Sequence, residues 1–129
     1  MQPEEFKKNC QRTKSEEFFY NSVHPDLLHA AIGITTEAGE LMDTVKKPFF
    51  YGAEFDQVNF EEELGDLLWY IAIACDRLDI TFEEIMEKNI QKLKTRFPMK
   101  FSKYDALHRD VSSERKVLEK NADELFRTA

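Results

Sequence analysis

The feature of this sequence with the clearest chemical potential is a short acidic motif that occurs twice. The first copy holds Glu37 and Glu40, the second holds Glu63 and Asp66, and a glycine directly precedes the last residue of each. Carboxylates three residues apart lie on one face of a helix about a turn from each other, where like charges repel mildly. The spacing therefore gains a helix nothing unless a cation lies between the carboxylates.

The glycines strengthen this interpretation. Glycine inside a helix costs about 1 kcal/mol relative to alanine, but it lets another backbone or side chain approach closely. Leucine residues adjoin both motifs, which indicates that each acidic face borders an apolar surface. A helix–loop–helix arrangement would bring the two carboxylate pairs face to face.

Four converging carboxylates without cysteine or histidine are hard oxygen ligands, which suit Mg²⁺, or else Mn²⁺, better than zinc or copper. A di-iron carboxylate bundle is a second metal interpretation, but it expects Glu-x-x-His pairs, and neither motif contains histidine. The ordinary alternative is a pair of solvated acidic faces. The paired glycines and adjoining leucines favour the hard-metal site.

Helical periodicity and helix-start signals predict the elements that would position these carboxylates. Asn59 with Glu62, and Thr81 with Glu84, have the spacing of a capping box, while Pro48 predicts a helix end. An aromatic loop is expected from Phe49 to Val58. The expected helices run from Pro3 to about Lys14, from Pro25 to about Lys47, from Asn59 to about Leu78, from Thr81 to about Phe97, and from behind Ser112 and Ser113 through Phe126.

The composition supports one all-α domain over residues 1–129. The chain has 129 residues with 42% hydrophobic content, and only 4 Gly and 4 Pro, so turns are few and long helices are favoured. No strand pattern competes. We expect a helical bundle of four or more helices, completed by oligomerisation because apolar residues surround most of the girth of the long helices.

Charge and apolar runs exclude several classes of partner. A net charge of −7 excludes a general binder of nucleic acid polymers. The longest apolar run, Leu67 to Cys75, is less than half a membrane span. The first ten residues show no secretory signal, and two cysteines are too few for a disulfide framework. A cytoplasmic protein with reduced thiols is therefore expected.

The acidic motifs belong to three blocks that occur in order: His29–Gly33 with Glu37–Glu40, then Glu62–Tyr70, then Asn89–Pro98. Together the blocks resemble the MazG-like nucleotide pyrophosphohydrolases of the all-α NTP pyrophosphatase superfamily. The family signature is Glu-x-x-Glu, a variable gap, and Glu-x-x-Asp. The tail from Arg109 to Leu118 is similar to the short phage-type and stand-alone bacterial members.

The resemblance implies Mg²⁺-dependent hydrolysis of a nucleoside triphosphate, in particular (d)NTP to (d)NMP and pyrophosphate, in nucleotide-pool control or house-cleaning. It makes Glu37, Glu40, Glu63 and Asp66 the metal ligands and the catalytic residues. Breaking a phosphoanhydride needs an activated water and a charge clamp, which divalent ions supply. One of these carboxylates, or Glu62, would accept the proton of the water. Family members are dimers or tetramers, so a homodimer or homotetramer is expected.

Other residues are candidates for substrate binding, each with an ordinary surface or core role as the alternative. Lys47, or its neighbour Lys46, lies near the face of Glu40 and would reach a phosphate. Lys92 and Arg96, four residues apart, would grip phosphate oxygens. The aromatic and amide candidates are Trp69 for base stacking, Tyr70 on the face of Asp66, Asn89 for a sugar or base edge, and His29 beside the pocket.

Two function classes compete with the hydrolase. A non-catalytic helical interaction module of the same fold would not need all four carboxylates intact, and a redox di-metal protein would be separated by metal analysis. The sequence does not name the preferred nucleotide, because base selection depends on loop geometry around Phe49 to Phe55.

Overall fold

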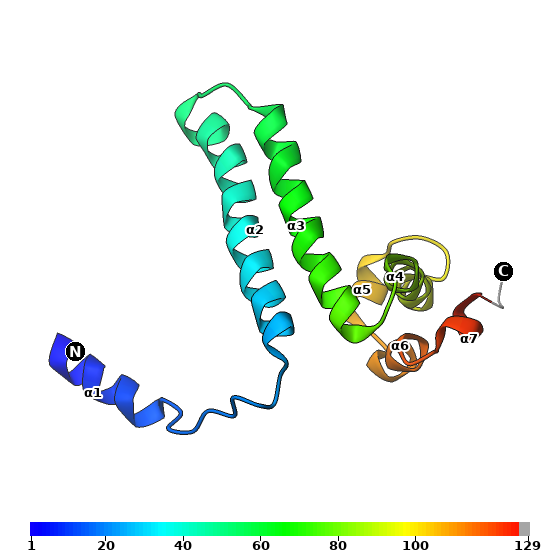
Figure 1. The fold of residues 1–129 in the computed structure, drawn as a ribbon, viewed down its shortest axis with the longest axis horizontal. Coiled ribbons are helices and arrows are strands. Elements are labelled where there is room, and N and C mark those ends of the chain that lie inside the picture. The colour runs from blue at the N-terminus through cyan, green and yellow to red at the C-terminus, as the bar shows by residue number, and fades with distance from the viewer. Residues whose placement is uncertain (127–129) are drawn as a thin grey trace.

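The computed structural model describes residues 1–126, and within them the secondary structure is helical with no strand, which confirms the all-α prediction. The helices form two packed groups, α2 with α3, and α4 with α6 and α7 (Figure 1). Their bounds are α1 Pro3–Thr13, α2 Pro25–Tyr51, α3 Gln57–Leu78, α4 Phe82–Arg96, α5 Lys103–Leu107, α6 Val111–Leu118 and α7 Ala122–Phe126.

Helix α2 is longer than its sequence predicts. The expected end at Pro48 is wrong, because Pro48 lies inside the helix, which continues to Tyr51. A proline removes one backbone hydrogen bond and crowds the carbonyl four residues before it, but the residues after it can keep helical geometry. The helix instead ends at Gly52, whose φ of 68° is the left-handed conformation common at helix C-termini and whose N–H donates to the Pro48 carbonyl at 3.2 Å.

The start of α3 also differs from the prediction. The cap is Asp56 rather than Asn59, and its carboxylate accepts a hydrogen bond from the Asn59 N–H at 3.1 Å. The expected aromatic loop from Phe49 to Val58 is therefore reduced to the short segment between α2 and α3. The predicted capping box at Thr81 and Glu84 is confirmed, with both reciprocal hydrogen bonds present.

The C-terminal region divides into more pieces than expected. In place of the single last helix that the sequence predicts, the structure has two helices, α6 and α7. Helix α6 ends at Leu118, and Asn121 then caps α7 by accepting a hydrogen bond from the Glu124 N–H at 3.0 Å. Asp110, not Ser112 or Ser113, caps α6. The segment 103–107, which lies outside the helices expected from the sequence, forms α5.

One glycine determines how closely α2 and α3 pack. A Cβ atom at Gly33 would lie 2.1 Å from Cε1 of Tyr70, so the Tyr70 ring lies directly against the α2 backbone. The expectation of a close approach at Gly39 and Gly65 is wrong within this chain, since a Cβ at either position would meet nothing within 4 Å. The close contact therefore lies one turn before the first acidic motif.

Gly33→Ala is expected to destabilise the fold. The added methyl must displace the Tyr70 ring or separate the helices, at about 1–3 kcal/mol, which outweighs the gain of up to about 1 kcal/mol from replacing a helical glycine. Gly39→Ala is the matched control and is expected to melt at or above the wild-type temperature. Equal melting temperatures for wild type and Gly33→Ala, measured by circular dichroism, would contradict the packing described here.

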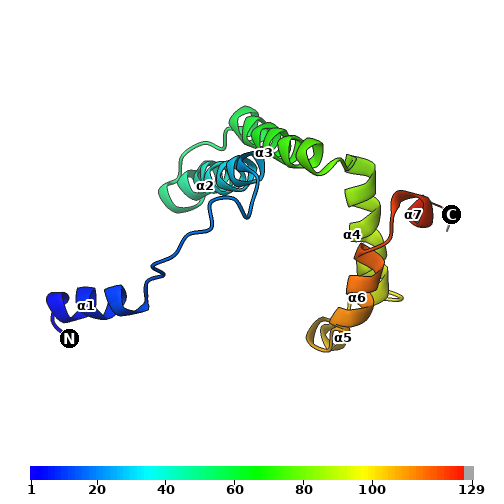
Figure 2. The ribbon, with the colours of Figure 1, turned by 60° about the horizontal axis from the view of Figure 1, so that its bottom comes forward.

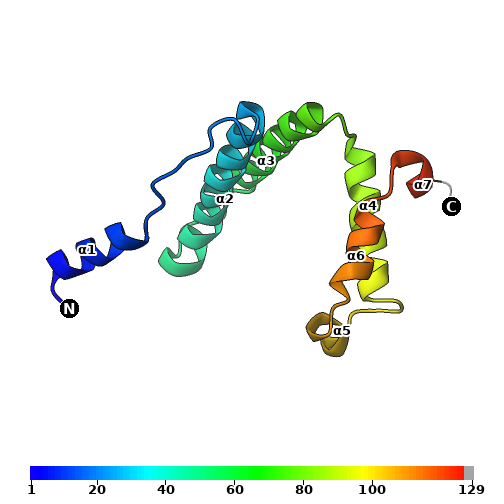
Figure 3. The ribbon, with the colours of Figure 1, turned by 90° about the horizontal axis from the view of Figure 1, so that it is seen from below.

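The chain exposes far more surface than a compact protein of its size. Its accessible surface is 10906 Å², whereas about 7,100 Å² is typical of a folded 15.2 kDa monomer. The buried apolar residues among those described are Ala30, Cys75 and Leu125. Figures 2 and 3 show the reason: α4 turns away from α3, and α1 lies apart from both packed groups. No helix within residues 1–126 has the length and apolar content needed to cross a bilayer.

Candidate metal centre

Three of the four predicted ligand carboxylates lie together between α2 and α3. One oxygen from each of Glu37, Glu63 and Asp66 lies within 4.8 Å of the other two. Helix α2 supplies Glu37, and α3 supplies the other two. Glu63 is buried, with 7% of its surface exposed, while Glu37 is half-buried and Asp66 is exposed. The packing of the hairpin thus brings together the two motifs that the sequence places far apart.

The cluster concentrates negative charge. Burial raises the pKa of Glu63, and the charges of Glu40, Glu37 and other nearby carboxylates raise it further. The pKa of Glu37 is raised in the same way, first by burial and then by Glu40 and Asp66. Each shift means that the ionised carboxylate is disfavoured by its surroundings. A cation among these oxygens would reverse that preference.

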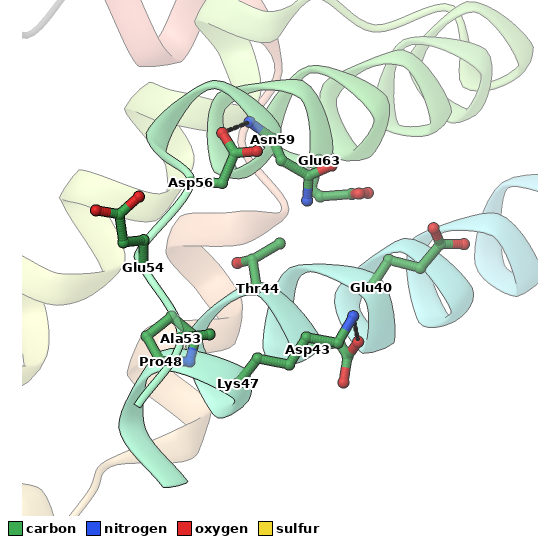
Figure 4. A pocket seen from close by; sticks show the side chains of 10 residues that line it. All are labelled: Glu40, Asp43, Thr44, Lys47, Pro48, Ala53, Glu54, Asp56, Asn59 and Glu63. Atoms are coloured by element: carbon green, nitrogen blue, oxygen red, sulfur yellow. Dashed lines mark hydrogen bonds and ion pairs between the residues drawn. The ribbon is translucent and has the colours of Figure 1, made fainter. Parts of the chain in front are cut away.

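Glu40 and Glu63 both line a cavity of about 420 Å³ that opens between the end of α2 and the start of α3. Figure 4 shows Glu40 and Glu63 on facing helices at one side of this space. The cavity is therefore continuous with the carboxylate cluster. Its lining residues are Glu40, Asp43, Thr44, Lys47, Pro48, Ala53, Glu54, Asp56, Asn59 and Glu63.

Lys47 lines this cavity, as the prediction of a cation near Glu40 requires. Its Nζ lies 2.5 Å from Asp43 Oδ2, and Nζ of Lys46 lies 2.5 Å from the other oxygen of Asp43. Hydrogen bonds from both lysines lower the pKa of Asp43. The carboxylate of Asp43 therefore pairs with both ammonium groups, one of which belongs to Lys47, a residue that lines the cavity.

The two aromatic candidates lie outside this cavity, at the α2–α3 contact. The Tyr70 ring packs against Gly33 and meets the His29 ring edge-on at a centroid distance of 5.6 Å. Trp69 remains 56% exposed and meets the Tyr70 ring at 4.9 Å. Tyr70 therefore has a packing role in this chain, whereas the indole of Trp69 retains a free surface.

The three candidates on α4 are not brought to the carboxylates within one chain. Asn89, Lys92 and Arg96 lie on a helix that packs with α6 and α7 and turns away from α3 (Figure 3). Arg96 donates from Nε and Nη2 to the two carboxylate oxygens of Glu114, at 2.9 and 2.7 Å. Its guanidinium is thus paired with a carboxylate of α6 and not with a residue of the α2–α3 hairpin.

The sequence patterns missed part of this geometry. Asp43, Asp56 and Asn59 were not identified as cavity residues. Asp43 has a visible signal, because it lies three residues after Glu40 and four before Lys47, a spacing that places all three on one helical face. Asn59 has the spacing of a capping residue, and that pattern does not indicate its place in the cavity.

Comparison with known proteins gives one family and one relative. The model of the MazG nucleotide pyrophosphohydrolase domain matches residues 27–101, which include α3, α4 and all of α2 except its first two residues. The chain is similar to the "Gene 37 protein" of Mycobacterium phage L5, with 30% identity over 74 residues, 54% of this chain and 65% of the relative. The chain thus spans less than two thirds of that relative's length, and no solved structure matches.

Proposed function

The chain belongs to the MazG nucleotide pyrophosphohydrolase family, and from that premise we propose that it hydrolyses nucleoside triphosphates, (d)NTP, to the monophosphate and pyrophosphate. The observation that carries the proposal is the meeting of Glu37, Glu63 and Asp66 oxygens within 4.8 Å between two packed helices. A helical interaction module has no need of such a cluster, whose carboxylates repel one another.

The donor set fits a divalent metal ion. The oxygens are all carboxylate oxygens, which are the ligands that Mg²⁺ or Mn²⁺ prefers. The raised pKa values of Glu37 and Glu63 support the same conclusion, because a nearby divalent cation would favour the ionised forms. Glu37, Glu63 and Asp66 would hold the metal, with Glu40 as the fourth ligand. Bound there, Mg²⁺ would supply an activated water and neutralise phosphate charge.

The side chains of the site would orient the substrate around this centre. The α-phosphate would lie at the carboxylates, and the β- and γ-phosphates would extend toward Lys47, the cation that shares a cavity with Glu40 and Glu63. A cluster carboxylate or Glu62 would accept the proton of the attacking water. Trp69 would stack on the base. Asn89 and Lys92 would reach the site of a second copy rather than their own, since α4 turns away from the α2–α3 hairpin. Arg96, on the same helix, is held by Glu114.

The test is a panel of ordinary and damaged (d)NTPs with Mg²⁺ in H₂¹⁸O. Turnover is expected with Mg²⁺ or Mn²⁺ and is expected to vanish with EDTA. Water attacking the α-phosphorus places ¹⁸O in the monophosphate and leaves pyrophosphate unlabelled, and mass spectrometry separates these products. Label in pyrophosphate, or orthophosphate as the first product, would overturn the orientation. Binding without any turnover across the panel would favour the interaction module.

The chain is also proposed to form a homodimer or homotetramer. It exposes 10906 Å², about 3,800 Å² more than a compact monomer of its mass, which is more surface than one partner contributes to a standard interface. Large apolar residues are exposed along both long helices, among them Leu28, Ile32, Leu64 and Leu68. Light scattering at micromolar concentration is expected to give a multiple of 15.2 kDa. A single species at the monomer mass would contradict the assembly.

A further inference from the structure

The N-terminal arm, residues 1–24, belongs to neither packed group. Helix α1 has no buried residue, and the packed helix pairs of the described chain are α2 with α3 and α4 with α6 or α7. Figures 1 and 3 both show α1 and the following segment lying apart from the hairpin. The arm therefore has surface available for another molecule.

That surface is concentrated in three consecutive aromatic residues. Phe18, Phe19 and Tyr20 are 63%, 73% and 85% exposed. The Phe18 and Tyr20 rings contact each other, at a centroid distance of 6.2 Å. Aromatic side chains bury large areas on contact, and a contiguous exposed apolar patch is typical of an interaction site.

A matching surface lies on the outer side of α2. A shallow hollow of about 370 Å³ is lined by Ala31, Ile32, Thr35 and Thr36, mostly through apolar atoms. Ile32 is 55% exposed, and Leu28, one turn earlier, is 57% exposed. Since no charged residue lines the hollow, aromatic rings can enter it without the cost of burying a charge.

Local hydrogen bonds direct the arm away from its own α2. The Ser22 N–H and hydroxyl both donate to the Phe19 carbonyl, at 3.0 and 2.8 Å. His24 caps α2 by accepting from the Asp26 N–H at 3.2 Å, and Pro25 restricts the backbone of the residue before it. The turn and the cap together set the direction in which the aromatic residues leave the helix.

From these features we propose that the arms are exchanged between copies: Phe18, Phe19 and Tyr20 of one copy occupy the hollow on α2 of another. The accessible surface of one chain exceeds that of a compact monomer, and the excess is large enough for an interface with a second copy. Charge also permits a second copy, because the first twenty residues carry four acidic and four basic side chains and so do not add to the net charge of −7. The proposal rests on self-association but is independent of the metal chemistry.

Photo-crosslinking between isotopically distinct copies tests the exchange. The full chain carries p-benzoylphenylalanine in place of Tyr20, and ¹⁴N and ¹⁵N preparations are unfolded together and refolded. Crosslinks from position 20 to residues 28–36 are expected in peptides that pair a light chain with a heavy one. Crosslinks only within chains of one isotope would show that the arm folds back on its own helix and would overturn the proposal, as would crosslinks that miss α2.

Substitution of the aromatic residues gives a second measurement. A variant with Phe18→Ser, Phe19→Ser and Tyr20→Ser is expected to self-associate at least about tenfold more weakly, measured by light scattering over a dilution series. Phe101→Ser, which removes an aromatic residue of similar exposure outside the arm, is the matched control and is expected to associate as the wild type does. Unchanged association of the triple variant would overturn the exchange even if the chain is an oligomer.

Discussion

Glu63→Gln is expected to lower nucleoside triphosphate turnover by at least about 100-fold and, at the same time, to raise the melting temperature of the metal-free protein. The substitution removes a proposed metal ligand, and losing a group that stabilises transition-state charge typically costs 10²–10³-fold in rate. It also removes a negative charge that is disfavoured by burial and repelled by Glu40 and Glu37, as the raised pKa of Glu63 indicates. Few substitutions at a packed position are expected to stabilise a protein and inactivate it together.

The pH dependence of the stability of the metal-free protein provides a second test of the charge at Glu63. Because the folded protein binds a proton at Glu63 more readily than the unfolded chain does, the metal-free wild type is expected to lose stability as pH rises from the ordinary pKa of glutamate to the raised value. The Gln variant lacks that part of the loss. Adding Mg²⁺ is expected to restore stability in the wild type above this range and to have less effect on the variant.

Glu61→Gln is the matched control, since Glu61 is exposed on the same helix and bonds only Gln57 among the described side chains. It is expected to retain wild-type turnover and a similar melting temperature. Kinetic assays and thermal melts with and without Mg²⁺ measure both effects. Wild-type turnover in Glu63→Gln would remove this carboxylate from the proposed centre.

Glu114→Ala is expected to release the C-terminal helices from α4 and to lower the melting temperature by roughly 10 °C. Glu114 is 3% exposed and accepts two hydrogen bonds from Arg96 and two from Arg109. Its loss leaves the side chain of Arg96, which is only 18% exposed, without that partner. Hydrogen exchange is expected to accelerate across residues 103–126 while the α2–α3 hairpin remains protected.

The control for this variant is Glu119→Ala, which removes an exposed pair with Arg115 on the same helix and is expected to change little. Acid provides an independent measurement. The two arginines hold the pKa of Glu114 far below its ordinary range, so its contribution is complete at neutral pH and is lost as pH falls below the ordinary glutamate range. Equal exchange in Glu114→Ala and wild type would contradict this role.

The sequence predicts those parts of the molecule that depend on near neighbours along the chain. The carboxylate motifs are periodic within single helices, and the Thr81–Glu84 cap is a contact across one turn, so residue spacing is sufficient for both. The helix end predicted at Pro48 was wrong because a proline disturbs the turn before it rather than the residues after it. The left-handed conformation of Gly52 determines the end instead.

Contacts between distant residues explain the remaining differences. Arg96 has the spacing of a phosphate-binding pair with Lys92, but its partner Glu114 lies eighteen residues away, and no local pattern indicates that pairing. Similarly, the Tyr70 ring packs against Gly33 on the other helix of the α2–α3 hairpin, a contact between residues far apart in the sequence. The carboxylate cluster could be predicted because its members repeat a motif, whereas the cavity beside it is formed by residues that share no motif.

The contact between Gly33 and Tyr70 constrains how this family can diversify. A methyl group at position 33 would lie 2.1 Å from the ring, so a descendant could enlarge the glycine only after the residue at position 70 had become smaller. The order of the two substitutions matters, because the reverse order passes through a strained protein. Such a pair should covary between lineages. In chains whose structures are not determined, the two residue types should then reveal the spacing between the helices that carry the clustered carboxylates.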